Sequence, residues 1–579
     1  MKALLPALLL LALAPPAQAE PNQPTYADAI RETVYVESAI DGDGDGRRDR
    51  IVTDIIRPRT AHKVPVLMGM SPYNAPDKPT VLSTDVLRPG DGWIKDLEDD
   101  GHPDFFPYMY DNYFVPRGYA VVVADMPGTR FSEGCIDIGG PNEVQAAKAV
   151  IDWLGGRAKA YGRDGTEIKP EWTTGDVGMF GKSWDGTLAN QVATTNVPNL
   201  KTIVPVAAIS SWYDYTRVNG LRRFDDHPGM LAGGSLLRNE KCADELAELR
   251  KQADTTADYN AFWDRRNFVD DAWKVKASVF AIHGLNDTNV TVSHLAKWWE
   301  NLRAPRKLWL AQTQHTSPQS FRPAEFLPTV HRWFDQWLKG VDTGIMREPA
   351  VEVERFPGVW EKDAVWPAPT KSRKINLGDY ATGPQSFTDA PTLSQTELAG
   401  DASDGHRLRY ITEPLAKDTR LSGTPSITLR VSADVPNTPI SALLVDYGAD
   451  TRSETEDSDL RPIPGKENCF GEGLAPDTGC YQAYERVTRA APLHVVSRGT
   501  IDAAHRFSLS FAVPLEPGRT ETITWRLQPQ DYVFKQGHRI GIVIAGNNNV
   551  DWSHYRPTYP SGEITVSLRG SYVNLPLVP

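Results

Sequence analysis

The stretch GDVGMFGKSWDGTLANQ, residues 175–191, decides the fold of this 579-residue chain. A short apolar strand is predicted over 177–180, and a helical pattern begins directly after the turn that follows it. The turn resembles the G-x-S-x-G elbow, in which small residues allow a strained turn that lifts a serine hydroxyl out at the head of a helix. Its first glycine is Gly181, but the second falls one place late, at Gly186. The order of strand, turn and helix predicts that Ser183 is a nucleophile.

Strand and helix patterns alternate on both sides of this motif, from about residue 30 to 345. Helices are predicted over 141–155, which opens with Pro141, and over 323–340, which ends in Gly340. Strands separated by helices imply a mostly parallel sheet that is covered on both faces. The strands are predicted at residues 50–56, 64–70, 119–125, 177–180, 202–209, 278–284 and 307–312.

An acid and a histidine are expected after the serine, in the order Ser, Asp, His of α/β hydrolases, because a hydroxyl is a weak nucleophile without a base. Asp287 comes directly after the strand predicted at 278–284, and His315 follows the next predicted strand. Both fall at the carboxyl ends of strands, where α/β sheets keep their active sites. We therefore predict Ser183, Asp287 and His315 as the catalytic residues of an α/β-hydrolase domain. Competing histidines lie in helical patterns or on the strand before the acid; they are His294, His331 and His283.

The charged oxygen of the reaction intermediate needs two hydrogen-bond donors. The backbone amide of Trp184, directly after the nucleophile, is predicted to supply one of them. The Gly-rich HGGG loop of lipases is missing, and the strand predicted at 64–70 runs instead into Ser71-Pro72-Tyr73. We predict the Tyr73 hydroxyl as the second donor of the oxyanion hole. Packing is the alternative role for this tyrosine.

The residue pattern changes at about residue 350: helical patterns end, and apolar residues then alternate with polar or small ones with a period of two. Alternating apolar residues predict strands at 426–432, 506–513 and 522–527. Several such strands with turn signals between them indicate an antiparallel sandwich. We predict that residues 351–579 form a β domain.

A segment rich in charge and helix formers interrupts the sheet pattern at about 213–275. A loop of this length inside a compact domain is usually a functional lid, and the alternative is a surface decoration. We therefore predict one α/β-hydrolase catalytic domain over 20–350, with an inserted helical lid.

The chain begins with MKALLPALLLLALAPPAQAE, which contains one lysine, an apolar run and the sequence Ala-Gln-Ala. This pattern is typical of a secretory signal peptide, here residues 1–19, with cleavage expected after Ala19. A membrane anchor is the weaker alternative, because the apolar run is shorter than the roughly 20 residues that span a bilayer. We expect a secreted or periplasmic protein without a membrane partner.

Export favours disulfide bonds between the four cysteines, because oxidising compartments preserve them. Cys469 and Cys480 bracket a loop that a bridge would close, and Cys135 and Cys242 would then form the second pair. A metal site or a catalytic thiol fits less well, since no CxxC spacing occurs. The sequence leaves the pairing open.

Charge and motifs argue against several partners and cofactors. Lys and Arg number 62 against 74 Asp and Glu, and this balance excludes a basic nucleic-acid footprint. The sequence DGDGDGRRD at 41–49 matches the opening of a calcium loop, but Val52 stands where a bidentate glutamate belongs. We favour a Gly-rich turn between two strands there. No metal or cofactor is predicted, since P-loop, dinucleotide and HExxH patterns are also missing.

Four motifs follow one another along the chain: GKSWDGT (181–187), with ATT shortly after it, ISSWYDYTRVNG (209–220), HGLNDTNV (283–290) and VHRWFDQWLKGVDTGI (330–345). In this order they resemble the X-prolyl dipeptidyl aminopeptidases, relatives of bacterial cocaine esterase and the α-amino acid ester hydrolases. The resemblance covers about residues 30–345 closely, and the β domain in outline as a jelly roll. It implies the catalytic residues and oxyanion hole given above, and a peptide substrate with a free N-terminus and a penultimate proline.

The resemblance also implies a pocket for the proline ring. It assigns Trp212, Tyr215 and Val290 to this pocket, and it places Asn289 near the polar backbone of the substrate. A flat apolar ring fits between aromatic faces, because its burial is worth about 25 cal/mol per Å² and leaves no amide proton unpaired. Ordinary core packing is the alternative for the two aromatic residues.

One part of the predicted lid departs from these enzymes. They carry an acidic residue in a Gly-Glu-Asp stretch as the partner of the substrate amine, and this chain has FDDHPGMLAGG there. Asp225 or Asp226 is expected to take the role, or Glu240 farther along. The predicted function is that of a secreted serine exopeptidase that releases X-Pro dipeptides. The alternatives are a secreted serine esterase or acylase of the cocaine esterase or α-amino acid ester hydrolase type, an endopeptidase, and a binding protein without activity.

Overall fold

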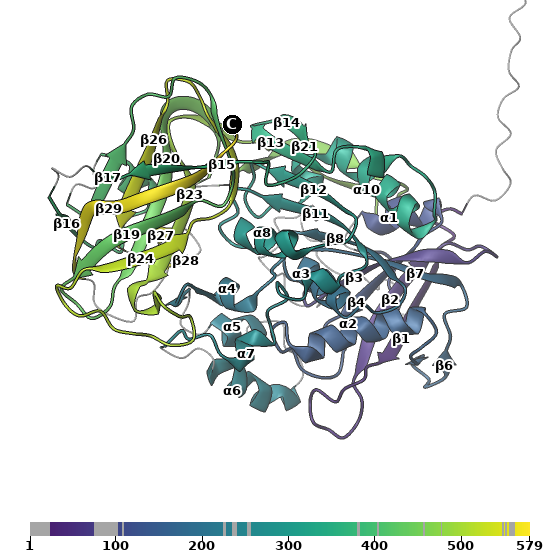
Figure 1. Ribbon diagram of the computed structural model, residues 1–579. Helices are drawn as coiled ribbons and strands as arrows, with labels where there is room; N and C mark the ends of the chain where they lie inside the picture. The colour runs from purple at the N-terminus through teal and green to yellow at the C-terminus, as the bar shows by residue number, and fades with distance from the viewer. Residues whose placement is uncertain are drawn as a thin grey trace, which may run out of the picture.

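The computed structural model of the protein shows two domains side by side, one of mixed helices and strands and one of strands (Figure 1). No helix within the described ranges is long and apolar enough to cross a membrane. The predicted signal peptide lies outside these ranges. The structure describes residues 24–74, 102–106, 109–223, 227–233, 240–251, 256–378, 383–401, 405–455, 458–475, 477–546, 549–550, 553–554 and 562–579.

One large sheet forms the centre of the first domain. Its strands, in spatial order, are β14 (Val359–Asp363), β13 (Val351–Phe356), β12 (Arg306–Ala311), β11 (Ser278–Gly284), β8 (Leu200–Val206), β7 (Thr173–Lys182), β3 (Val64–Ser71), β4 (Ala120–Asp125), β2 (Arg50–Arg57), β1 (Ile30–Glu37), β5 (Ala160–Tyr161) and β6 (Glu167–Ile168). Neighbouring strands from β4 to β13 run parallel, and the pairs at both margins are antiparallel. The predicted, mostly parallel sheet is confirmed.

Helices cover both faces of this sheet, as predicted. Every residue of β3, β4 and β11 is buried, because neither face of these strands meets water. Pro141 and Pro323 each begin a helix, where the missing N–H group is not needed. On one face lie α2 (Pro141–Leu154), α3 (Trp184–Thr194) and α8 (Val292–Asn301), and on the other lie α1 (Tyr110–Phe114), α9 (Pro318–Phe321) and α10 (Pro323–Leu338).

The segment between β8 and β11 forms the predicted helical insertion. A disulfide between Cys135 and Cys242 ties the start of its longest helix to the loop after β4. The insertion contains α4 (Trp212–Thr216), β9 (Arg217–Val218), β10 (Leu221–Arg222), α5 (His227–Gly233), α6 (Ala243–Lys251) and α7 (Ala261–Asp264).

The β domain consists of two antiparallel sheets that share one core, which confirms the predicted sandwich of jelly-roll type. Leu429 and Ile523 enter this core from one sheet, and Leu444 and Ile542 enter it from the other. The first sheet contains β24 (Glu521–Arg526), β19 (Ser426–Ala433), β29 (Glu563–Leu577), β18 (Thr419–Gly423), β25 (Gln530–Phe534), β15 (Lys371–Asn376) and β16 (Gln385–Thr388). The second contains β17 (Arg407–Ile411), β26 (Arg539–Ala545), β20 (Pro439–Ser453) and β23 (Thr488–Asp502). Smaller elements are α11 (Gln395–Ala399), β27 (Asn549–Val550) and β28 (Ser553–His554).

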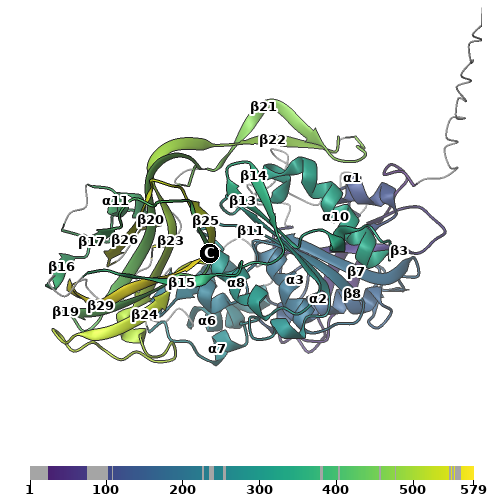
Figure 2. The same cartoon turned by 45° about the horizontal axis from the view of Figure 1, so that its top comes forward.

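A long hairpin leaves the β domain and lies over the first domain (Figure 2). It consists of β21 (Leu460–Cys469) and β22 (Cys480–Arg486), and a disulfide between Cys469 and Cys480 closes its end. The structure therefore contains both of the disulfide pairs that the sequence had left open.

The prediction of a strand at 506–513 is wrong. After β23 the chain makes a short 3-10 turn and leaves the sheet, and Phe507 and Phe511 are 64% and 55% exposed. Leu509, between them, packs against the core of the first domain, and its carbonyl accepts the N–H of Tyr259 in the insertion at 2.7 Å. Leu509 therefore makes an inter-domain contact, the two phenylalanines face solvent, and the segment is not a strand.

The large sheet extends beyond the predicted end of the catalytic domain. β13 and β14 follow residue 350, yet both are strands of the large sheet. The chain thus completes this sheet before it enters the sandwich. The division at 350 stays a prediction, because a boundary can also be drawn after β14.

His505 joins the β domain to the insertion. Its Nδ1 lies 2.6 Å from Asp502 Oδ2, and its Nε2 lies 2.9 Å from Asp258 Oδ1. A second link runs from the Asn219 side-chain amide to the Thr500 carbonyl at 2.8 Å. Burial of the ring disfavours its charge, but the hydrogen bonds to the two carboxylates outweigh this effect and raise the pKa of His505.

We expect replacement of His505 by glutamine to remove a pH-dependent part of the stability. Because the folded-state pKa is raised, the imidazolium stabilises the fold fully below the unfolded value of about 6.5, and this contribution is lost as the pH rises through the folded value. The wild type should have a larger free energy of unfolding than His505→Gln at about pH 6, and this difference should be smaller at about pH 9. Urea unfolding followed by tryptophan fluorescence measures this difference, and a constant value would contradict the prediction.

Candidate active site

The predicted nucleophile lies in the turn between β7 and α3. Ser183 has φ 59° and ψ −124°, a strained conformation for a residue with a side chain. A Cβ added to Gly181 would lie 2.5 Å from the backbone carbon of Asp185, and one added to Gly186 would lie 2.7 Å from the Gly181 oxygen. The turn therefore needs its second glycine at position 186, which explains the departure from G-x-S-x-G.

The predicted acid and histidine form a direct hydrogen bond at the carboxyl ends of β11 and β12. His315 Nδ1 lies 2.7 Å from Asp287 Oδ2, while Asp287 Oδ1 accepts the N–H groups of Asn289 and Val290, each at 2.9 Å. Burial disfavours ionisation of Asp287, but the charge and hydrogen bond of His315 hold its pKa below the usual value. The carboxylate orients the ring through Nδ1 and leaves Nε2 to exchange a proton.

The turn of Ser183 and the histidine loop are neighbours. Lys182, directly before Ser183, donates its ammonium group to the His315 carbonyl at 3.3 Å. The loop after β11 is joined to the same histidine loop, because the Asn286 N–H donates to the Thr313 carbonyl at 3.0 Å. The structure thus brings the turn of the serine and the loops of the acid and the histidine to one edge of the sheet.

His283, a competitor of His315 in the sequence, has a different environment. Its Nε2 lies 2.7 Å from the Val290 carbonyl, and its ring is buried beside Asp287 at the end of β11. Burial lowers the pKa of His283, so the ring stays neutral and donates to the carbonyl. His283 is therefore a packed, hydrogen-bonded residue at the end of β11.

The two predicted oxyanion donors come from the loop after β3 and the first turn of α3. Burial, together with nearby Asp185, raises the pKa of Tyr73 well above that of a free phenol, so its hydroxyl stays protonated. Trp184 begins α3, where backbone N–H groups have no partner within the helix. Its indole Nε1 donates to Glu143 Oε2 at 3.0 Å and so fixes the side chain.

The residues assigned to the proline pocket also lie together. Trp212 and Tyr215 on α4 make an edge contact with ring centroids 5.6 Å apart, and Trp212 lies 4.9 Å from the ring of Trp184. The Tyr215 hydroxyl donates to Asn289 Oδ1 at 3.1 Å. An aromatic group therefore lies between α3 and the loop of Asp287.

The candidate partners of the substrate amine cannot be placed. Asp225 and Asp226 lie outside the described residues, and the side chain of Glu240 is not described. Their assignment stays a prediction.

Sequence reasoning missed Arg223, which joins the insertion to the acid loop. The guanidinium is buried and donates to the carbonyls of Thr288, Asn289 and Tyr215 at 2.7, 2.8 and 3.2 Å. It therefore fixes the loop of Asp287 relative to α4. The insertion contains many charged residues, and no pattern in the sequence separates this arginine from the exposed ones.

The sequence also missed Glu143, a buried carboxyl group behind Trp184. Burial and the neighbouring Asp137 raise the pKa of Glu143, and the indole hydrogen bond offsets part of the effect. Glu143 lies in the first turn of α2, where an acidic residue is also favourable because of the helix dipole.

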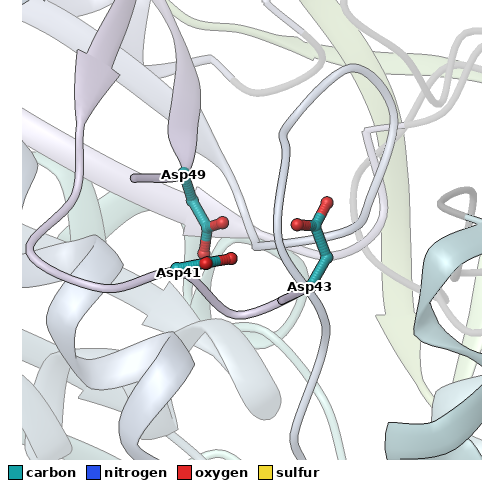
Figure 3. Close-up of side chains that lie close together, drawn as sticks. All are labelled: Asp41, Asp43 and Asp49. Carbon is teal, nitrogen blue, oxygen red and sulfur yellow. The ribbon is translucent and has the colours of Figure 1, made fainter. Parts of the chain in front are cut away.

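Three carboxylates of the acidic loop between β1 and β2 lie together. Asp41, Asp43 and Asp49 each offer an oxygen within 4.8 Å of the others (Figure 3). Asp45 instead contacts Lys241, whose Nζ lies 2.7 Å from it and 3.7 Å from Asp43. The loop joins two antiparallel strands, as the sequence favoured, and Lys241 of the insertion pairs with its carboxylates.

Known proteins resemble both parts of the chain. Residues 43–317 match the family model of the X-Pro dipeptidyl-peptidases (S15 family), and residues 343–574 match that of the X-Pro dipeptidyl-peptidase C-terminal non-catalytic domain. An Xaa-Pro dipeptidyl-peptidase of Lacticaseibacillus rhamnosus is 30% identical, over 90% of this chain and 73% of its own. A Streptomyces avermitilis protein, named provisionally as an Xaa-Pro dipeptidyl-peptidase, is 39% identical over 96% of this chain and 84% of its own.

Solved structures share the whole arrangement of domains. An α-amino acid ester hydrolase superposes with a TM-score of 0.65 at 18% identity and covers 98% of this chain and 100% of its own. A CocE/NonD family hydrolase from Staphylococcus aureus gives a TM-score of 0.66 at 17% identity, over 95% and 94% of the two chains. At these identities the likeness concerns the fold.

The parallel sheet, the strained serine turn and the jelly-roll sandwich define an α/β hydrolase with an appended β domain. Within this class, the matches to family models and relatives over nearly the full length of the chain identify the family. The chain belongs to the X-Pro dipeptidyl-peptidase family S15 and is a hydrolase.

We expect Gly186→Ala to destabilise the protein by about 1–3 kcal/mol, because the added methyl group overpacks the turn around Ser183. Gly383→Ala is the matched control, since a Cβ there has no atom within 4 Å, and it should change stability by no more than about 0.5 kcal/mol. Urea unfolding of the two variants makes the comparison. Equal stability of both variants would show that the second glycine is not required.

Proposed function

We propose that this protein is a secreted serine exopeptidase that releases X-Pro dipeptides from the N-termini of peptides. The observation that carries the proposal is the 2.7 Å hydrogen bond between His315 and Asp287, at the edge of the sheet where the strained turn holds Ser183. Membership of the S15 family supports the same activity.

In the proposed mechanism, Ser183 Oγ attacks the carbonyl carbon of the penultimate proline. His315 takes the serine proton on Nε2 and returns it to the leaving amine, so the peptide bond breaks and an acyl-enzyme forms. Asp287 stabilises the imidazolium that exists between these two transfers. Water, deprotonated by the same histidine, then attacks the ester and releases the dipeptide.

The negative charge on the proline oxygen is proposed to be bound by the Trp184 amide and the Tyr73 hydroxyl. A neutral phenol suits this role because it donates a hydrogen bond without adding a second negative charge. The amide is held at the start of α3, where the helix dipole also favours negative charge.

The aromatic group is proposed as the proline pocket. Trp212, Tyr215 and Val290 are buried apolar residues in and beside the acid loop, and Asn289 accepts the Tyr215 hydroxyl there at 3.1 Å. Proline brings no backbone N–H into the pocket, so its burial leaves no donor unpaired. For the substrate amine we propose Asp225 or Asp226, or Glu240, because ammonium binding needs a carboxylate.

Secretion or periplasmic location is proposed from the N-terminal sequence, with cleavage after Ala19. The disulfides Cys135–Cys242 and Cys469–Cys480 support an oxidising compartment. We propose no cofactor, since acyl transfer by a serine needs none.

A secreted esterase or acylase is the second candidate. The fold shared with an α-amino acid ester hydrolase favours it, and the same serine, histidine and acid would hydrolyse an ester. The two candidates differ in the substrate that enters the pocket.

The choice of substrate separates these functions. We expect Ala-Pro p-nitroanilide to be hydrolysed at least about 100-fold better, in kcat/KM, than Ala-Ala p-nitroanilide or a simple aryl ester, because only proline fills the pocket. Acetylation of the substrate amine should abolish hydrolysis. Ser183→Ala is the control and should be inactive in each assay. A preference for the ester would favour the esterase, and indifference to acetylation would indicate an endopeptidase.

Loss of the phenol hydroxyl should slow the chemical step. We expect Tyr73→Phe to lower kcat by about 10²–10³-fold with little change of KM, because the hydroxyl binds the charge that develops in the transition state. Steady-state kinetics with Ala-Pro p-nitroanilide measure both constants. A kcat within about twofold of the wild type would leave only a packing role for this residue.

A further inference from the structure

The hairpin of β21 and β22 reaches from the β domain across the first domain (Figure 2). Near its far end, Phe470 and Tyr481 enter the apolar core around α1 and α10, and the Tyr481 hydroxyl donates to Asn112 Oδ1 at 3.0 Å. This end of the hairpin is thus fixed to the core around α1 and α10, and not to the catalytic loops. Its base lies at the histidine loop, where Asp459 precedes β21 and Arg486 ends β22.

Asp459 holds the residues on both sides of the proposed catalytic histidine. Its Oδ2 accepts the backbone N–H of Gln314 at 2.9 Å, and its Oδ1 accepts the hydroxyl of Thr316 at 3.4 Å. The carboxyl group is buried, with 3% of the residue exposed, and His315 lies between its two partners in the chain. Burial raises the pKa of Asp459, while the Gln314 hydrogen bond and the nearby charge of Arg486 offset part of the effect.

Arg486 holds the start of the same loop. Its guanidinium donates to the Gln312 carbonyl at 2.9 Å and to both oxygens of Glu354 at 2.9 and 2.8 Å. Glu354 Oε2 in turn accepts the Gln312 N–H at 2.7 Å. The loop from 312 to 317 has no regular secondary structure, so these side chains take the place of a backbone ladder.

The β domain also contacts the acid loop. Gln530 on β25 donates its side-chain amide to the Leu285 carbonyl at 2.8 Å. Gln528 accepts the N–H of Ser293, at the start of the helix that follows this loop, at 3.1 Å. Both loops that carry the hydrogen-bonded pair Asp287 and His315 are therefore held by side chains of the C-terminal domain.

We propose that Asp459 of the C-terminal domain is a positioning residue for the reaction, which sets the place of His315 through the backbone of residue 314 and the hydroxyl of Thr316. The inference rests on the proposed role of His315 as the catalytic base. It assigns a part in turnover to a domain whose family counterpart is described as non-catalytic.

The test compares two buried aspartates of the same hairpin in the full-length protein. Asp459→Ala removes both acceptors from the histidine loop. Asp477→Ala is the matched control, because Asp477 is 2% exposed and accepts the Asn112 side chain at 3.2 Å and the Gly479 N–H at 2.8 Å, away from the catalytic loops. Both variants lose a buried contact between the hairpin and its surroundings.

We expect Asp459→Ala to lower kcat for Ala-Pro p-nitroanilide by about 10–100-fold with KM within about twofold, because a shifted base loses its alignment with the serine. Asp477→Ala should lower the midpoint of urea unfolding but keep kcat within about twofold of the wild type. Asp459→Asn should recover most of kcat, since its carbonyl still accepts the Gln314 N–H and its amide donates to Thr316. Equal kcat values of the two alanine variants, or no recovery in Asp459→Asn, would overturn the inference.

A second variant covers the case in which Asp459→Ala does not fold. Asp459→Glu keeps the charge and the acceptors but moves them by one methylene group, so kcat should fall at unchanged KM. A kcat equal to that of the wild type overturns the inference. Ser183→Ala separates the two claims: if it keeps turnover, the proposed function fails and the inference with it. If it loses turnover while kcat of the Asp459 variants is unchanged, only the inference fails.

Discussion

The pairing of β11 with β12 is the constraint on which the candidate active site depends. Asp287 and His315 are 28 residues apart, and they meet because their strands are parallel neighbours, with Ile282 opposite Trp309. Parallel strands end at the same edge, so the loops that follow them lie side by side. A slip of one residue would turn every side chain of a strand to the other face, and it would exchange large and small residues between the two cores, such as Phe280 and Ala281.

The sheet brings the loops together, but polar side chains from three regions fix them. Arg223 of the insertion binds the carbonyls of the acid loop, Lys182 of the serine turn binds the His315 carbonyl, and Asp459 and Arg486 of the β domain hold the histidine loop. Each contact satisfies a backbone group that has no partner in a ladder. These contacts limit the arrangements of the loops that carry His315 and Asp287, because loops alone sample many.

The sequence predicted the parts of the structure that local patterns encode. The strands of the sheet, α2 and α10 follow from apolar runs and from the prolines that begin the helices, and the serine turn follows from its glycines. Long-range contacts were not predictable in this way. Leu509 alternates with Phe507 and Phe511 as in a strand, yet it packs half-buried against the core of the first domain, a partner that no local pattern identifies. Arg223 and Asp459 were missed for the same reason, since a buried charged residue looks like an exposed one in the sequence.

The two domains contact each other at the edge of the large sheet. β13 supplies Glu354, which pairs with Arg486 of the hairpin, and β13 covers the apolar edge of β12 with Leu308 opposite Val351. A chain cut at residue 350 would leave that edge unpaired, and an exposed apolar edge strand invites aggregation. It would also remove every contact of the histidine loop with Asp459 and Arg486. The large sheet and the sandwich are therefore joined at the edge that carries His315, where Arg486 of the hairpin binds Glu354 of β13.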